Sequence, residues 1–145
     1  MEFKTQAHKA IFERVAGLLK EMFGEMVQQR PDRTVFWIQF GSCIVNIGVN
    51  QWGDEDATVI VYCYVVTGAD LRQDLLLHLL KKNDTTRFGA FSVDEYNNVC
   101  FQQTIIGSTV DKTQLKATVM AVAYTSDNSD DEIVSRWGGQ RAMDR

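Results

Sequence analysis

The side chains best suited to chemistry are few in this sequence, and none is spaced as in a known kind of site. The three cysteines, Cys43, Cys63 and Cys100, include no Cys-x-x-Cys pair and are odd in number. That spacing predicts neither a disulfide framework nor a zinc site. The two histidines, His8 and His78, stand in different halves of the chain, and we interpret His78 as a structural residue. We expect no metal, no organic cofactor and cysteines that act as small core residues.

One acidic stretch, Asp127–Glu132, raises the question of calcium binding. It lacks the central glycine and the regularly spaced carboxylates of an EF-hand loop, so a solvated acidic face is the preferred interpretation. The sequence has no glycine-rich phosphate loop, Gly-x-Ser-x-Gly elbow or His-Glu-x-x-His motif. Acid–base catalysis would have to depend on carboxylates that no pattern singles out. We therefore predict no catalytic residues and no enzymatic activity.

Composition limits the class of protein further. The chain has 145 residues, of which 45% are hydrophobic and 23% charged, and it has one proline and no linker-like stretch. These values predict one globular domain over residues 1–145. The net charge of −4 argues against a general nucleic-acid binder. The first residues do not form a secretion signal, and no segment reaches the roughly 18 uncharged apolar residues of a membrane span. We expect a cytoplasmic protein that binds neither nucleic acid nor membrane.

The first expected element is an amphipathic helix from about Thr5 to Gln29. A rotation of about 100° per residue gathers its apolar side chains on one broad face. These are Ile11, Val15, Leu18, Leu19, Met22 and Met26. Gly17 and Gly24 fall on the polar side, where we expect simple tolerance of glycine. Pro31 is expected to end the helix, because the residue before a proline is pushed out of the α region.

Three strands are expected next, at Val35–Phe40, Cys43–Val49 and Ala57–Val66. These runs are rich in valine, isoleucine and aromatic residues. The two residues between the first pair, Gly41 and Ser42, predict a tight hairpin in which Gly41 adopts a positive φ.

Trp37 is the residue of the first strand that we expect to bind a partner. Strand residues alternate between two faces, and both sets contain a large apolar side chain. The sets are Val35, Trp37 and Gln39 against Phe36, Ile38 and Phe40. Tryptophan is enriched among the residues that dominate binding energy. The alternative is that the first helix covers this face and Trp37 belongs to the core, so the sequence leaves the exposed face undecided.

A second helix is expected from Asp70 to Lys82, with Asp70 and Gln73 as a capping pair. Leucines occupy several of its sides, at positions 71, 75, 76, 77, 79 and 80. A helix that is apolar on so many sides is usually covered on more than one of them. Either other elements cover it within the monomer, or Leu76, Leu77 and Leu80 form the interface of a two-fold homodimer, which is our prediction.

Two more strands and a last helix complete the expected order. The strands are Phe88–Val93 and Val99–Ile106, and the helix starts near Asp111. It either continues to Trp137 or breaks within Thr125–Ser129, whose side chains compete for backbone hydrogen bonds. The order of helix, three strands, helix, two strands and C-terminal helix predicts an α+β domain with helices packed on one antiparallel sheet.

The middle of the chain carries a family resemblance. A helix ends in Leu79–Asn83, a Phe-Gly-x-Phe strand follows in Phe88–Asp94, and an acidic turn leads into Asn98–Phe101. These features resemble the YbjN-like branch of the bacterial type III secretion chaperone-like fold, and the element order agrees with that fold over nearly the whole chain. The resemblance implies a small non-enzymatic bacterial protein that dimerises and binds other polypeptides or regulates a process. It supplies no catalytic residues.

Two hypotheses for function follow. The preferred one is a chaperone-like or regulatory adaptor that acts as a homodimer and binds an unidentified polypeptide through its sheet and flanking helices. The alternative is a small-ligand-binding protein or enzyme whose site is built from scattered carboxylates and aromatic residues, such as Trp37, Trp52, Tyr62 and Tyr64. A deep polar pocket with convergent titratable groups would favour the alternative, whereas exposed apolar side chains on a sheet would favour the adaptor.

Overall fold

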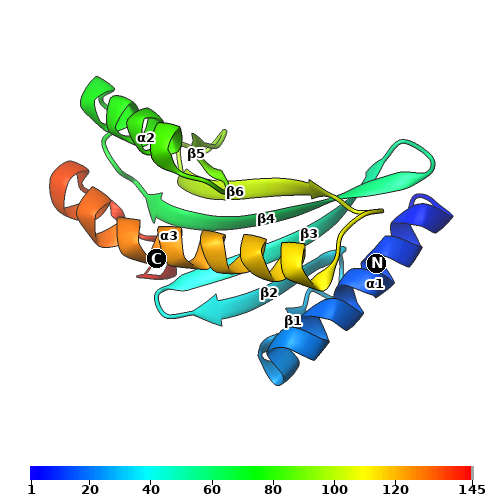
Figure 1. The fold of residues 1–145 in the computed structure, drawn as a ribbon. Helices are drawn as coiled ribbons and strands as arrows, with labels where there is room; N and C mark the ends of the chain where they lie inside the picture. Colours follow the sequence, from blue (N-terminus) through cyan, green and yellow to red (C-terminus); the bar gives the residue numbers. More distant parts are fainter. Residues whose placement is uncertain (145) are drawn as a thin grey trace.

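The computed structural model, which describes residues 1–144, has three α-helices packed on an antiparallel sheet (Figure 1). The elements are α1 (Gln6–Phe23), η1 (Gly24–Met26), β1 (Gln28–Gln29), β2 (Val35–Phe40), β3 (Cys43–Trp52), β4 (Asp56–Thr67), α2 (Gln73–Thr85), β5 (Ala90–Val93), β6 (Val99–Ile106), α3 (Lys112–Trp137), β7 (Gln140–Arg141) and η2 (Ala142–Asp144). Helices α1 and α3 lie across the same face of the sheet, and α2 lies at its β5 end (Figure 1). The predicted α+β class is confirmed.

The strand order in the sheet is β1-β2-β3-β4-β6-β5, and β7 pairs with β4 outside this path. All the pairings are antiparallel. Alternate residues of the three long central strands are buried under α1 and α3, as the period of two in a strand requires. In β3 and β4 these are Cys43, Val45, Ile47, Val49, Ala57, Val59, Val61, Cys63 and Val65. The core therefore lies between the sheet and the two long helices.

The β2–β3 hairpin has the turn that its sequence predicts. Gly41 has a φ of 54°, and β2 begins and ends where the run of β-branched and aromatic residues does. Strand β6 also has its predicted bounds, whereas β3 and β4 are longer than their apolar cores, because their polar ends continue the pairing from Asn50↔Thr58 to Trp52↔Asp56.

Helix α1 ends earlier than predicted, and the expected role of Gly24 is wrong. The helix stops at Phe23, and Gly24 follows with a φ of 57° while its N–H bonds the Lys20 carbonyl. Glycine adopts this left-handed region without the steric cost that a Cβ imposes, so it ends the helix before Pro31 can. Met26 consequently leaves the helical stripe and is exposed.

Helix α2 is displaced by three residues from its predicted start. It begins at Gln73, its N-cap is Arg72, and no side chain caps it, so the Asp70 and Gln73 capping pair does not form. Strand β5 begins at Ala90 rather than Phe88. Asn83 joins the two elements, because its Oδ1 accepts the Phe91 N–H at 2.7 Å and its Nδ2 donates to the Phe91 carbonyl at 3.2 Å.

Helix α3 is continuous from Lys112 to Trp137, which decides between the two alternatives that the sequence left open. Asp111 caps it, with Oδ1 accepting the Gln114 N–H at 2.7 Å. Ser126 and Ser129 do not break the helix. Both are buried on the side of α3 that faces the sheet. Gly138 and Gly139, both with positive φ, end it and turn the chain into β7. None of the helices in the described residues is long and apolar enough to cross a membrane.

Candidate functional site

Trp37 lies on the face of the sheet that α1 and α3 leave uncovered. Its neighbour Phe36 points the other way and stacks on Phe12 of α1, with ring centroids 4.7 Å apart. Trp37 is in register with Asn46, Asn46 with Tyr62, and Tyr62 with Gln102. Directly opposed residues share a face, so these four side chains form one row across the sheet. We call the face that carries this row, opposite α1 and α3, the helix-free face. Trp37 is half-buried there and is not part of the core under the helices.

A cavity of about 620 Å³ opens on the helix-free face. The loop between β1 and β2 forms one wall, and Ala142 and Met143 of η2 form another. Its floor consists of alternate residues of the sheet, Val35, Ile44, Asn46, Tyr62 and Tyr64. This volume is within the usual range of about 300–1,000 Å³ for ligand sites. The lining combines aliphatic and aromatic side chains with charged and polar ones, and Asn46 belongs to the floor itself, so the cavity suits a short stretch of another molecule that has both polar and apolar groups.

Two arginines give the cavity its charge. Arg33 forms a fork with Asp32, whose carboxylate lies 3.0 Å from Nη2, and this hydrogen bonding holds the pKa of Asp32 below its usual value. Arg30 has no ion-pair partner within residues 1–144, and its guanidinium carbon lies 6.0 Å from the centre of the Trp37 ring. Burial raises the pKa of Tyr62, so its phenol remains neutral and can both donate and accept a hydrogen bond.

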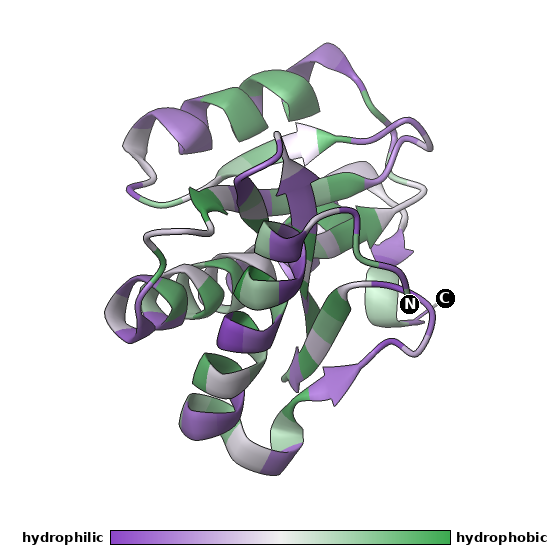
Figure 2. Ribbon diagram, turned by 90° about the vertical axis from the view of Figure 1, so that its right-hand side faces the viewer, coloured by the Kyte–Doolittle hydropathy of each residue, from purple (hydrophilic) through white to green (hydrophobic). Residues whose placement is uncertain are grey.

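A second exposed apolar surface lies on α2. Leu75 and Leu79 are buried, whereas Leu76, Leu77 and Leu80 are 38%, 44% and 63% exposed, and we call these three the leucine surface. Hydrophobic turns of α2, along the top of Figure 2, alternate with hydrophilic ones. The structure does not combine this surface with Trp37 in one site, because α2 lies at the β5 end of the sheet and β2 is near the other end.

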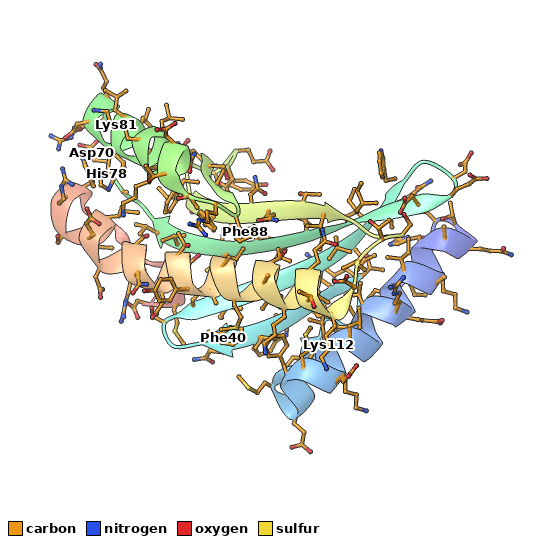
Figure 3. The ribbon with its side chains drawn as sticks, viewed as in Figure 1. Phe40, Asp70, His78, Lys81, Phe88 and Lys112 are labelled. Atoms are coloured by element: carbon orange, nitrogen blue, oxygen red, sulfur yellow. The ribbon has the colours of Figure 1, made fainter. Side chains whose placement is uncertain are left out.

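His78 has the structural position that the sequence indicated. It lies between α2 and the last turns of α3 (Figure 3), with Nε2 3.3 Å from Glu132 and its ring 5.0 Å from that of Trp137. Lys82 Nζ reaches the other oxygen of Glu132 at 3.1 Å. Desolvation lowers the pKa of His78 although Glu132 opposes the shift. These contacts join α2 to α3.

The cysteines are all buried, as expected of small core residues. Burial raises the pKa of Cys100 to about 12, and a hydrogen bond with Cys63 together with burial raises the pKa of Cys43. Cys43 and Cys100 are therefore held in the protonated form, in which a thiol is a poor nucleophile, whereas the hydrogen bond from Cys43 lowers the pKa of Cys63.

The acidic stretch of α3 differs in part from the predicted solvated face. Asp127 and Asp130 both contact the Ser42 hydroxyl in the β2–β3 turn, and Asp130 is only 3% exposed. The apolar period of the helix places Asp130 toward the sheet, where Ser42 can reach it. No group of three potential ligands within residues 1–144 could hold a metal ion.

Sequence reasoning missed Arg30, Asn46 and Met143 of the helix-free face. Asn46 lies on the opposite side of its strand from the buried Val45 and Ile47, and that side is the one with the cavity. Arg30 and Met143 come from segments without periodicity. Arg30 follows β1, which pairs with β2, and Met143 follows β7, which pairs with β4, so these two pairings place both residues at the cavity.

The chain matches one family model over residues 9–145, the TY-Chap1 model of "T3SS (YopN, CesT) and YbjN peptide-binding chaperone 1". The protein therefore belongs to this family of peptide-binding chaperones, which confirms the resemblance seen in the sequence. No curated protein sequence matches the chain significantly.

Solved structures have the same fold. A chain of the ExsC–ExsE complex is 16% identical, with a TM-score of 0.65 over 84% of this chain and 95% of that one. A chain of the HopA1–SchA chaperone–effector complex is 10% identical, with a TM-score of 0.63 over 85% and 96%. A chain of the complex of the Yersinia pestis type III secretion chaperone SycH with a fragment of YscM2 is 11% identical, with a TM-score of 0.59 over 83% of this chain and 98% of that one. At these identities the similarity concerns the fold.

Proposed function

We propose that this protein is a chaperone-like adaptor that binds a segment of another polypeptide on its helix-free face and acts as a homodimer. The observation that carries the proposal is the position of Trp37, half-buried on a sheet face that no α-helix covers; a 620 Å³ cavity opens on the same face, and Arg30, which lines that cavity, lies over the Trp37 ring. Antiparallel sheets can expose one face, and a contiguous apolar surface that stays exposed is typical of an interaction site. The matching family of peptide-binding chaperones supports the same function.

The leucine surface supports the dimer. Leu80 and its two neighbours remain exposed although Leu75 and Leu79 of the same helix are fully covered. A two-fold axis through α2 would bury both copies of the surface against each other, in the commonest arrangement of soluble oligomers. The proposed location is the bacterial cytoplasm, as the family resemblance implies.

Affinity capture with Trp37→Ala tests the binding role. The tagged wild-type protein is used to capture the partner from its native cells, and the partner is then purified for direct binding. We expect Trp37→Ala to lose the partner while the free energy of unfolding stays nearly constant. Trp52→Ala is the matched control, because Trp52 is exposed on the β3–β4 hairpin, away from the cavity floor. A destabilisation of about 3 kcal/mol or more by Trp37→Ala would assign Trp37 to the core and contradict the proposal.

A further inference from the structure

We infer that the segment bound on the helix-free face is acidic: a carboxylate pairs with Arg30, which lies over Trp37, and an adjacent large apolar side chain enters the cavity that Arg30 lines. This inference rests on the proposed function and specifies the chemistry of the partner. It concerns the peptide class that this particular cavity selects.

The position of Arg30 carries the first step. Its backbone N–H donates to the Val35 carbonyl at 2.9 Å, which fixes the start of the loop against β2. Its side chain lines the cavity and lies over Trp37, with no ion-pair partner in the part of the chain that the structure describes. A guanidinium offers five N–H donors in a planar fork that fits a carboxylate. An unpaired guanidinium at the edge of an aromatic cavity therefore favours an acidic ligand.

The other charges around the cavity determine where the acid binds. Asp32 already neutralises Arg33, so Arg30 supplies the remaining positive charge at this wall. Next to Ser42, Asp127 of α3 does not line the cavity but accepts hydrogen bonds from the Ser42 N–H and hydroxyl, so its negative charge lies near that wall. A ligand carboxylate is attracted to the Arg30 side and repelled at the Ser42 side. The bound segment thus has one orientation, although the whole protein carries a net charge of −4.

Part of the cavity floor suits an apolar residue next to the acid, although Asn46 adds a polar side chain to it. Val35 and Ile44 are aliphatic, Tyr62 presents a ring, and Met143 closes the wall opposite the loop. Methionine adapts its shape to different apolar partners, so the cavity can accept either an aromatic or a large aliphatic side chain. Acidic segments without such an anchor would gain only an exposed ion pair, which contributes little affinity.

A phage-displayed library of random short peptides tests the inference. Peptides are selected on the immobilised wild-type protein, and those that also bind Trp37→Ala are removed. We expect the selected sequences to be enriched in aspartate or glutamate next to an aromatic or large aliphatic residue. Lack of acidic enrichment among Trp37-dependent peptides would overturn the inference and leave the proposed function standing. Failure to select any Trp37-dependent peptide would overturn both.

Titration of one selected peptide isolates the ion pair. Replacing its acidic residue by the matching amide should raise Kd about three- to tenfold, and so should Arg30→Gln in the protein. The two changes together should raise Kd no further than either one alone, because both remove the same ion pair. Arg14→Gln on the exposed side of α1 is the control and should leave Kd unchanged. An Arg30→Gln variant with the wild-type Kd would contradict the inference.

Discussion

The Ser42 hydroxyl lies 2.7 Å from Oδ2 of Asp130 and, at the same time, 2.6 Å from Oδ1 of Asp127. A hydroxyl has one proton, so the two carboxyl groups either share it or one of them supplies a proton of its own. Burial raises the pKa of Asp130, whereas hydrogen bonds from Ser42 lower the pKa of Asp127. Asp130 is therefore the easier of the two carboxyls to protonate, and the Ser42 hydroxyl lies within hydrogen-bond distance of both. This chain of hydrogen bonds holds the β2–β3 turn against α3.

The two carboxyls should affect stability with opposite pH dependence. A carboxyl whose folded-state pKa is raised stabilises the fold fully below its unfolded value of about 3.9, and this contribution is lost as pH rises through the folded pKa. Asp130→Asn should therefore raise the melting temperature at pH about 7, because a neutral amide removes the buried charge and can still form a hydrogen bond with Ser42. Asp127→Asn should lower it there, since the ionised form of Asp127 stabilises the fold above the unfolded pKa and that contribution is lost as pH falls. Thermal unfolding from pH about 3 to 8 measures both, and an Asp130→Asn variant that is less stable at neutral pH would contradict this account.

The oligomeric state should depend on the leucine surface. Light scattering at micromolar concentration should give the mass of a dimer for the wild-type protein and that of a monomer for Leu77→Glu combined with Leu80→Glu. Met120→Glu is the matched control, because Met120 is 41% exposed but lies on α3. A monomer mass for the wild-type protein would contradict the dimer.

The two glycines of the α1 region should respond to alanine in opposite directions. A Cβ at Gly17 meets no atom within 4 Å, and its helical backbone suits alanine, so Gly17→Ala should stabilise the protein by up to about 1 kcal/mol. Gly24 has equal space but a φ of +57°, so Gly24→Ala should destabilise it by about 1–2 kcal/mol. Urea unfolding gives both values, and equal effects at the two sites would show that Gly24 does not end the helix as described.

Asn83 should be the residue that holds β5 against α2. Asn83→Ala removes both hydrogen bonds to the Phe91 backbone and should cost about 1–3 kcal/mol. Asn83→Asp retains the acceptor for the Phe91 N–H and should cost less. Hydrogen exchange would locate the effect: the Phe91 amide should lose protection in Asn83→Ala, while unchanged protection would rule out this role.

The sequence predicted those parts of the fold that repeat a pattern. The alternation in Cys43–Val49 and the leucines of the second helix allowed the elements to be identified, because burial on one side produces periodicity. Strands β1 and β7 contain two residues each and have no period to detect. The end of α1 was misplaced because Pro31 is a strong stop signal, but Gly24 comes first. The end of α1 depends on the φ of one residue, Gly24, and β1 and β7 depend on short local pairings, so none of these features leaves a repeating pattern in the sequence.

The site was less accessible to prediction than the fold. Trp37 could be selected by residue type, but both alternating sets of its strand contain large apolar side chains, so only the packing of Phe36 on Phe12 identifies the free face. The contact between His78 and Glu132 joins two helices that are far apart in the chain. Arg30 became a candidate only through its place beside Trp37.

The central claim, that a peptide binds on the helix-free face at Trp37, is tested most directly by nuclear magnetic resonance of the tryptophan indole N–H groups. The three tryptophans report on three places: Trp37 on the helix-free face, Trp52 at the exposed hairpin and Trp137 buried between α2 and α3. Substitution of each tryptophan by phenylalanine assigns its signal. On titration with a selected peptide, the account predicts that the Trp37 indole signal shifts and saturates while those of Trp52 and Trp137 stay in place. A saturating shift at Trp52 or Trp137 with no change at Trp37 would contradict it.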